Sequence, residues 1–132
     1  PNSVFVADFI GRSNFFNVVA ANQESSTTSK VHALGQGFVV PAHPSAKSGN
    51  SVLLVRPESI RVSSHPVSGH INGLGVVENV VYYGEHVEYT LNTPEGTVIA
   101  ITSDPVFSEI LPIGSQAHFS FEPSRAWLLP KE

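Results

Sequence analysis

Residues 75–103 read GVVENVVYYGEHVEYTLNTPEGTVIAITS, and this stretch decides the fold class. Residues 86–92 alternate strictly, because Val87, Tyr89 and Leu91 point to one face while polar residues point to the other. Residues 92–96, Asn-Thr-Pro-Glu-Gly, are typical of a hairpin loop in which Gly96 tolerates a positive φ. The stretch therefore predicts three consecutive strands over residues 75–83, 86–92 and 97–103.

The same pattern of short apolar runs, separated by Gly, Pro, Asn and Ser, extends through most of the chain. It predicts further strands at residues 15–21, 37–40, 52–55, 59–62, 116–122 and 126–129. Residues 22–30 are polar and predict an exposed hairpin tip. Before the first strand, residues 3–11 predict a short helix that Ser3 caps and Gly11 ends. The expected fold is all-β with a short N-terminal helix.

Two segments of the chain echo each other. In residues 49–62 and in residues 114–129, a glycine turn leads into a strand, a proline interrupts it, and a second short strand follows. This echo predicts two small related β halves, about 14–62 and 70–130, joined by residues 63–69. Neither half is large enough to bury a full core, so we expect the halves to share one.

Composition excludes several classes of function. The 132 residues are 41% hydrophobic and include neither Cys nor Met, which excludes a thiol nucleophile, an iron–sulfur cluster and a Cys-ligated zinc site. Eleven acidic residues outnumber seven basic ones, and the basic residues are scattered along the chain, which disfavours nucleic-acid binding. The chain begins at Pro1 and contains no Met, which fits either removal of an initiator before proline or excision from a longer protein.

The familiar catalytic and ligand motifs are absent from the sequence. Each of the three lysines follows a residue other than glycine, so the sequence contains no P-loop. The glycine pairs at 35 and 37 and at 73 and 75 lead into strands and are interpreted as turns or bulges. His86 and Glu88 share a strand face without a third metal ligand nearby, and no serine lies in Gly-x-Ser-x-Gly. We expect no catalytic, cofactor or metal site in this chain.

Four stretches carry a family signal in a characteristic order. Residues 6–14, VADFIGRSN, and residues 55–60, VRPESI, are followed by Val81-Tyr-Tyr-Gly84 with its alternating strand, and then by the ending 114–129. In this order they resemble the TOBE (transport-associated OB) domain of the ATP-binding subunits of ABC importers. The pattern is most similar to the group that transports polyamines, iron(III), thiosulfate and phosphonates.

The resemblance implies an OB-like β barrel made of two halves, occupying residues 14–132, with residues 1–13 as the linker helix from an ATPase domain. It implies a regulatory and dimerisation domain without catalysis of its own, since ATP and Mg²⁺ would bind the ATPase domain of the parent subunit. The implied partners are a second copy of the subunit and the permease, at the cytoplasmic face of the membrane. A small regulatory ligand is compatible with the family, but no residue identifies its site.

The family motifs contribute eight residues, which we interpret as mainly architectural: Phe9, Gly11, Asn14, Arg56, Pro57, Glu58, Tyr83 and Gly84. Pro57 is expected to end a strand, and its two neighbours to fix nearby loops through charged hydrogen bonds. Gly84 is expected to bend the chain so that Tyr83 and Val87 face the same core.

Two other classes of function stay open at this stage. An OB-fold nucleic-acid-binding module is compatible with the β-rich pattern, but it needs exposed aromatics interleaved with basic residues. A small β-barrel enzyme is also conceivable, because residues that converge from separate strands leave no local motif. Salt-dependent binding to single-stranded DNA or RNA would favour the first alternative.

Overall fold

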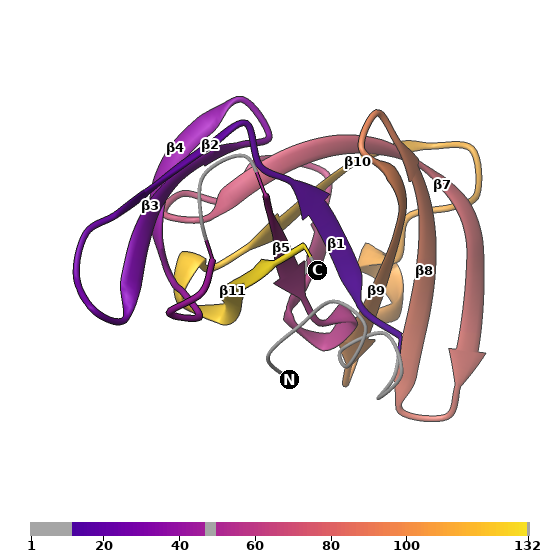
Figure 1. Cartoon of the computed structure of the whole chain (residues 1–132). Coiled ribbons are helices and arrows are strands. Elements are labelled where there is room, and N and C mark those ends of the chain that lie inside the picture. Colours follow the sequence, from indigo (N-terminus) through magenta and orange to yellow (C-terminus); the bar gives the residue numbers. More distant parts are fainter. Residues whose placement is uncertain (1–11, 47–49, 132) are drawn as a thin grey trace. The chain divides into compact units, whose positions relative to one another are not determined.

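The computed structural model describes residues 12–46 and 50–131 (Figure 1). The chain forms two compact units. Unit 1 takes residues 1–56 and 123–132, and unit 2 takes residues 57–122. The described residues form strands and three short 3₁₀ helices, which confirms the all-β prediction for that part of the chain. The predicted helix 3–11, with Phe9 and Gly11, lies outside the described residues. None of the helices described is long and apolar enough to cross a membrane.

Unit 1 is built from two three-stranded sheets. One has the order β1-β5-β11 and the other β2-β3-β4. Their strands are β1 (Asn14–Asn17), β2 (Ala20–Gln23), β3 (Thr28–Ala33), β4 (Gln36–Pro41), β5 (Ser51–Val55) and β11 (Ala126–Pro130). All five residues of β5 are buried, as expected for a central strand that is covered on both faces. On one face Val52, Leu54 and Leu129 form a cluster against which Phe15 and Trp127 pack.

The first strands of unit 1 differ from the prediction. The single strand expected over residues 15–21 is two strands that belong to different sheets, and the expected hairpin tip 22–30 contains the end of β2 and the first half of β3. The break falls at Val18 and Val19, where the Val19 side chain is 83% exposed and its N–H donates to the His32 carbonyl at 2.8 Å. Strand propensity alone does not reveal where a chain leaves one sheet for another.

Unit 2 is a single five-stranded antiparallel sheet with the order β6-β10-β7-β8-β9. Its strands are β6 (Arg61–Ser63), β7 (Ile71–Tyr83), β8 (His86–Thr93), β9 (Gly96–Ser103) and β10 (Gln116–Phe121). The 13 residues of β7 pair first with β10 and then with β8, and a register shift between Val77 and Asn79 bends the strand at that change of partner. The two edge strands β6 and β9 contact each other, so the sheet curls around a face of buried apolar side chains.

The internal echo of the sequence has a structural counterpart. In both copies a strand is followed by a 3₁₀ helix that begins at proline, η1 (Pro57–Ser59) or η3 (Pro123–Arg125), and then by a short strand. The boundary between the units falls at both prolines, because β5 pairs with β11 in unit 1 while β6 pairs with β10 in unit 2. The compact units therefore differ from the expected halves 14–62 and 70–130. At each proline turn the chain leaves a strand of one unit and enters a strand of the other, from β5 to β6 and from β10 to β11.

Three of the four glycines interpreted as turns or bulges lie inside strands instead. Gly73 and Gly75 are interior residues of β7 and Gly37 lies in β4, whereas Gly35 does occupy a turn, with φ +74°. Gly73 pairs with Phe119 of β10, and a Cβ on Gly73 would overlap the Phe119 ring. The glycine is therefore required by close packing, a need that the sequence pattern does not reveal.

Candidate functional site

Of the two motif residues described in unit 1, only Asn14 has a structural role. Asn14, at the start of β1, is buried and donates from Nδ2 to the carbonyl of Val55 at 3.2 Å, which ties β1 to the end of β5. Arg56 follows Val55 and is exposed. Neither Arg56 nor Glu58 of unit 2, which is also exposed, forms an ion pair or hydrogen bond within residues 12–46 and 50–131. The charged hydrogen bonds expected for these two side chains are therefore missing from the described part of the chain.

The motif residues of unit 2 lie at two separate turns. Pro57 is buried and begins η1, one residue beyond the end of β5, which agrees with its expected place at a strand end. Gly84 forms the turn between β7 and β8 with φ +58°. Tyr83 is 56% exposed, whereas Val87 is buried, so the expectation that they face one core is wrong. Tyr83 pairs with His86, and alternation along β8 sends Val87 to the opposite face.

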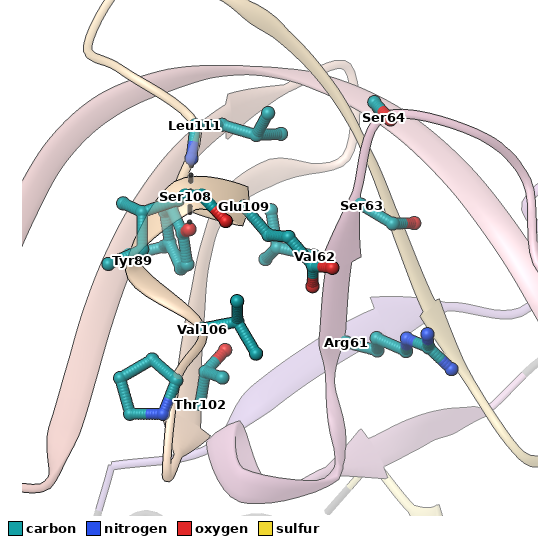
Figure 2. Close-up of a pocket in the computed structure, with 12 residues that line it drawn as sticks. Arg61, Val62, Ser63, Ser64, Tyr89, Thr102, Val106, Ser108, Glu109 and Leu111 are labelled. Carbon is teal, nitrogen blue, oxygen red and sulfur yellow. Dashed lines mark hydrogen bonds between the residues drawn. The ribbon is translucent and has the colours of Figure 1, made fainter.

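A cavity of about 440 Å³ opens within unit 2, at a place that the sequence did not indicate. It lies between β6, the strands β8 and β9, and the segment 105–111, which contains η2 (Phe107–Glu109) (Figure 2). Its lining combines apolar side chains with hydroxyls and a carboxylate, including Val62, Tyr89, Thr102, Val106, Ser108 and Glu109. Its volume falls within the range of small-molecule sites.

Tyr89 brings a polar atom to this largely buried wall. The residue is 3% exposed, and its hydroxyl oxygen accepts a hydrogen bond from the N–H of Leu111 at 3.2 Å (Figure 2). Burial raises the pKa of Tyr89 above its ordinary value, partly offset by the Leu111 hydrogen bond, and the nearby Tyr82 raises it slightly further. The hydroxyl therefore stays protonated at neutral pH. Besides the bond from Leu111, it can donate one hydrogen bond and accept one more.

The charged side chains of the lining are arranged asymmetrically. Figure 2 shows the Glu109 carboxylate reaching from η2 towards Val62 of β6, while Arg61 extends from the other side of β6, away from Glu109. Among the described residues, Arg61 and Glu109 form no ion pair with each other or with another side chain. Both residues belong to the lining of the cavity, which therefore includes one residue of each charge.

The charges of the chain are also divided unequally between the two units. Unit 2 contains eight of the eleven acidic residues but only one basic residue, Arg61. The sequence alone does not reveal this division, because the unit boundaries depend on which strands pair. Unit 2 therefore attracts cations and repels anions.

Exposed aromatic side chains also occur in unit 2. Tyr82 and Phe107 are 58% and 67% exposed and stack with ring centroids 6.3 Å apart, and Tyr83 is exposed as well. Stacking platforms for single-stranded nucleic acids are flanked by basic residues. These rings lie in the acidic unit, so the charge around them opposes binding to a phosphate backbone.

The histidines do not form a metal centre in the part of the chain that the structure describes. His86 lies at the start of β8, and its Nδ1 is 3.1 Å from the Ser103 hydroxyl. No group of three or more His, Asp or Glu side chains suited to a metal ion occurs among residues 12–46 and 50–131.

One signal in the sequence could have pointed to the cavity. Tyr89 was correctly placed on the buried face of its strand with Val87 and Leu91, but a tyrosine at such a position usually needs a partner for its hydroxyl. The partner, Leu111, and the acidic residue, Glu109, lie in a segment without periodicity. Only the folded chain brings them to Tyr89.

Comparison with known proteins identifies the family. A family model described as "TOBE domain" matches residues 53–129, which is more than half of the chain. The match includes Pro57, Gly84, the cavity and both proline turns. The chain therefore belongs to the TOBE domain family.

The relatives are ATP-binding proteins of importers. One is the spermidine/putrescine import ATP-binding protein PotA of Acidothermus cellulolyticus, 37% identical over 95 residues, or 70% of this chain and 25% of the relative. PotA of Marinobacter nauticus is 30% identical over 139 residues, covering 100% of this chain and 36% of the relative. The Fe(3+) ions import ATP-binding protein FbpC of Brucella abortus is 27% identical over 122 residues, covering 92% and 33%. The chain thus spans about a quarter to a third of the length of these relatives.

A solved structure supports the fold. The cytoplasmic molybdate-binding protein ModG, with molybdate bound, superposes with a TM-score of 0.70 over 90% of this chain and 96% of that protein, at 16% sequence identity. This likeness establishes a fold in common with ModG.

Proposed function

We propose that this chain is the regulatory and dimerisation domain at the C-terminal end of the ATP-binding subunit of an ABC-type importer. In this proposal it is an OB-like domain over residues 14–132, built from two related halves and connected to the ATPase domain through residues 1–13. It has no catalysis of its own, while the parent subunit binds ATP and Mg²⁺ elsewhere and couples ATP hydrolysis to solute uptake.

The observation that carries the proposal is the TOBE match over residues 53–129, together with relatives whose names describe import ATP-binding proteins. Three further features support it. The chain corresponds to about a quarter to a third of those relatives, it contains no P-loop, and its motif residues Asn14, Pro57 and Gly84 lie at strand ends and turns. A supporting domain attached to a separate catalytic domain has these properties.

The proposed partners follow from the same relationship. We expect a second copy of the subunit and the permease subunits as partners, at the cytoplasmic face of the cell membrane, and no nucleic acid. The excess of acidic residues in unit 2 supports the last expectation. The transported solute would belong to the range that includes polyamines and iron(III), since relatives of both kinds match the chain.

The test uses the reading frame that encodes Pro1 and the protein it produces. We expect a Walker A motif and an ABC signature upstream in the same frame, and ATP hydrolysis by the complete subunit but not by the present chain. Deleting residues 14–132 from the complete subunit should weaken its dimerisation in sedimentation experiments while leaving nucleotide binding intact. ATP turnover by the present chain alone, or a frame without an ATPase domain, would contradict the proposal.

A further inference from the structure

The two units of the chain carry charge of opposite sign. Unit 1 contains six of the seven basic residues and three of the eleven acidic ones, whereas unit 2 contains one basic residue and eight acidic ones. We propose that two copies of this chain associate reciprocally, so that a surface of unit 1 on each copy contacts a surface of unit 2 on the other. The inference rests on the proposed function for the role of a second copy, and it adds which surfaces meet.

The surface of unit 2 is its acidic tip, where β7 and β9 end and β8 begins. The tip consists of Tyr82, Tyr83, Glu85, Asp104 and Phe107, and all five residues are exposed. The Tyr82 and Phe107 rings stack on each other, so they form one apolar patch rather than isolated exposed side chains. Exposed aromatic clusters of this kind are typical of the centre of protein–protein interfaces.

Two carboxylates flank these rings. The N–H of Asp104 donates to the carbonyl of Glu85 at 2.8 Å, so the two acidic residues meet at one corner of the sheet. Among residues 12–46 and 50–131, neither carboxylate forms an ion pair or a hydrogen bond. Arg61, the sole basic residue of unit 2, lies on β6 and is not part of the tip. Adjacent like charges repel, and a cationic surface at this corner relieves the repulsion.

The surface of unit 1 is the open face of its β2-β3-β4 sheet. Residues that pair directly across antiparallel strands share a face, which here consists of Ala20, Asn22, Lys30, His32, Gly37 and Val39. All of these except the half-buried Ala20 are exposed, and none is acidic. Glu24, the only acidic residue described in unit 1, lies in the turn beyond the end of β2.

The open face complements the acidic tip in both charge and polarity. Lys30 forms no ion pair within the described part of the chain and can pair with the carboxylates of the tip. Val39 is exposed beside Lys30, and Val19 next to the same sheet is 83% exposed, so both can cover the Tyr82 and Phe107 rings. Apolar contact then contributes affinity, while the charges select the orientation of the two copies.

The size of the open face favours two simultaneous contacts. Strands about 4.8 Å apart that rise about 3.4 Å per residue give this three-stranded face an area on the order of 300 Å². One contact of that size buries on the order of 600 Å² in total, which is less than a specific interface needs. Two reciprocal contacts bury on the order of 1,200 Å², which reaches the lower end of specific interfaces. A two-fold axis relates two such contacts and closes the assembly at a dimer.

The experiment is sedimentation of the chain over a concentration series, with charge-reversed variants of both surfaces. We expect a concentration-dependent dimer that weakens severalfold as the salt concentration rises from about 0.05 to about 0.5 M. Lys30→Glu and Glu85→Lys should each weaken self-association at least tenfold, because each variant opposes like charges in both contacts of its dimer. Both positions are exposed, so the unfolding temperature should stay that of the parent chain.

Mixing the two reversed variants is the decisive measurement. In a mixed pair the two altered residues meet in one contact and the two unaltered residues meet in the other, so both contacts again join opposite charges. An equimolar mixture of Lys30→Glu and Glu85→Lys should therefore regain the dimer to within about threefold of the parent affinity. Two surfaces that attract only unrelated partners give no such recovery.

Matched controls carry the same changes of charge away from both surfaces. Lys131 follows β11 in unit 1, and Glu95 lies in the turn between β8 and β9, at the end of β8 opposite to Glu85. Lys131→Glu and Glu95→Lys should change the association less than twofold. Phe107→Ser removes one exposed ring of the tip and should weaken association about tenfold without unfolding the chain.

Three results would overturn the inference. These are a chain that stays monomeric throughout the concentration series, reversed variants that associate as tightly as their controls, and a mixture of the reversed variants that stays monomeric. The proposed function can fail separately. A reading frame without an ATPase domain would contradict it while leaving the association of this chain intact, whereas a complete subunit that dimerises equally well with Lys30→Glu and with Lys131→Glu would overturn only the reciprocal contact.

Discussion

The substitution Gly73→Ala tests the packing that curls unit 2. Gly73 and Phe119 face each other on β7 and β10, and a Cβ on Gly73 would overlap the ring of Phe119. Phe119 is 1% exposed, so its ring cannot move into solvent. Replacing glycine by alanine restricts the unfolded chain and stabilises a protein by about 0.4–1 kcal/mol when the site has room. Overpacking a core costs about 1–3 kcal/mol. We therefore expect Gly73→Ala to lower the free energy of unfolding by about 1–2 kcal/mol.

Gly37→Ala is the matched control. Gly37 on β4 also faces a ring across a strand pair, since a Cβ there would lie 2.6 Å from Cε1 of its partner His32. His32 is exposed and can rotate away into solvent at little cost. The clash should therefore be relieved, and the free energy of unfolding should change by less than about 0.5 kcal/mol.

The assay is urea unfolding followed by far-ultraviolet circular dichroism, with the fluorescence of Trp127 as a second probe that reports on unit 1. The expected loss in Gly73→Ala corresponds to a fall in melting temperature of about 3–5 °C per kcal/mol for a chain of this size. The double variant with Phe119→Leu should lose less stability than the sum of the single variants, because the smaller side chain makes room for the methyl group. Equal effects of the two glycine substitutions, or additive losses in the double variant, would refute the packing argument.

Two further predictions concern buried polar groups. Asn14→Ala should lower the free energy of unfolding by about 1–3 kcal/mol, because it removes the buried donor to the Val55 carbonyl. Asn17→Ala, at the exposed end of the same strand, should lower it by less than about 0.5 kcal/mol. Chemical denaturation of both variants measures the difference. Burial raises the pKa of Tyr89, so above pH about 10 the unfolded chain loses its phenolic proton while the folded chain keeps it. This contribution to stability is complete below that pH and is lost as the pH rises towards the pKa of the folded state. Alkaline unfolding curves of the parent chain and Tyr89→Phe check this, and a variant with the same alkaline loss as the parent would contradict it.

Local patterns predicted the strands of unit 2 well. The hairpin at residues 92–96 follows from its turn residues, and the alternation in 86–92 and 116–122 gave the correct buried faces, because strand period and turn chemistry act between neighbours in sequence. The break at Val19 and the interior glycines of β7 were missed, since both depend on which strand lies alongside.

The sequence by itself determined the all-β class, the proline-led echo and the family, because these depend on residue types at fixed short spacings. Only the tertiary structure decided that the chain passes from one unit to the other at Pro57 and at Pro123, that unit 2 is acidic, and that Tyr89 and Glu109 line one cavity. Each of these depends on pairs of residues that are distant in the chain. Their proximity is set by sheet order and curl, which no local pattern encodes.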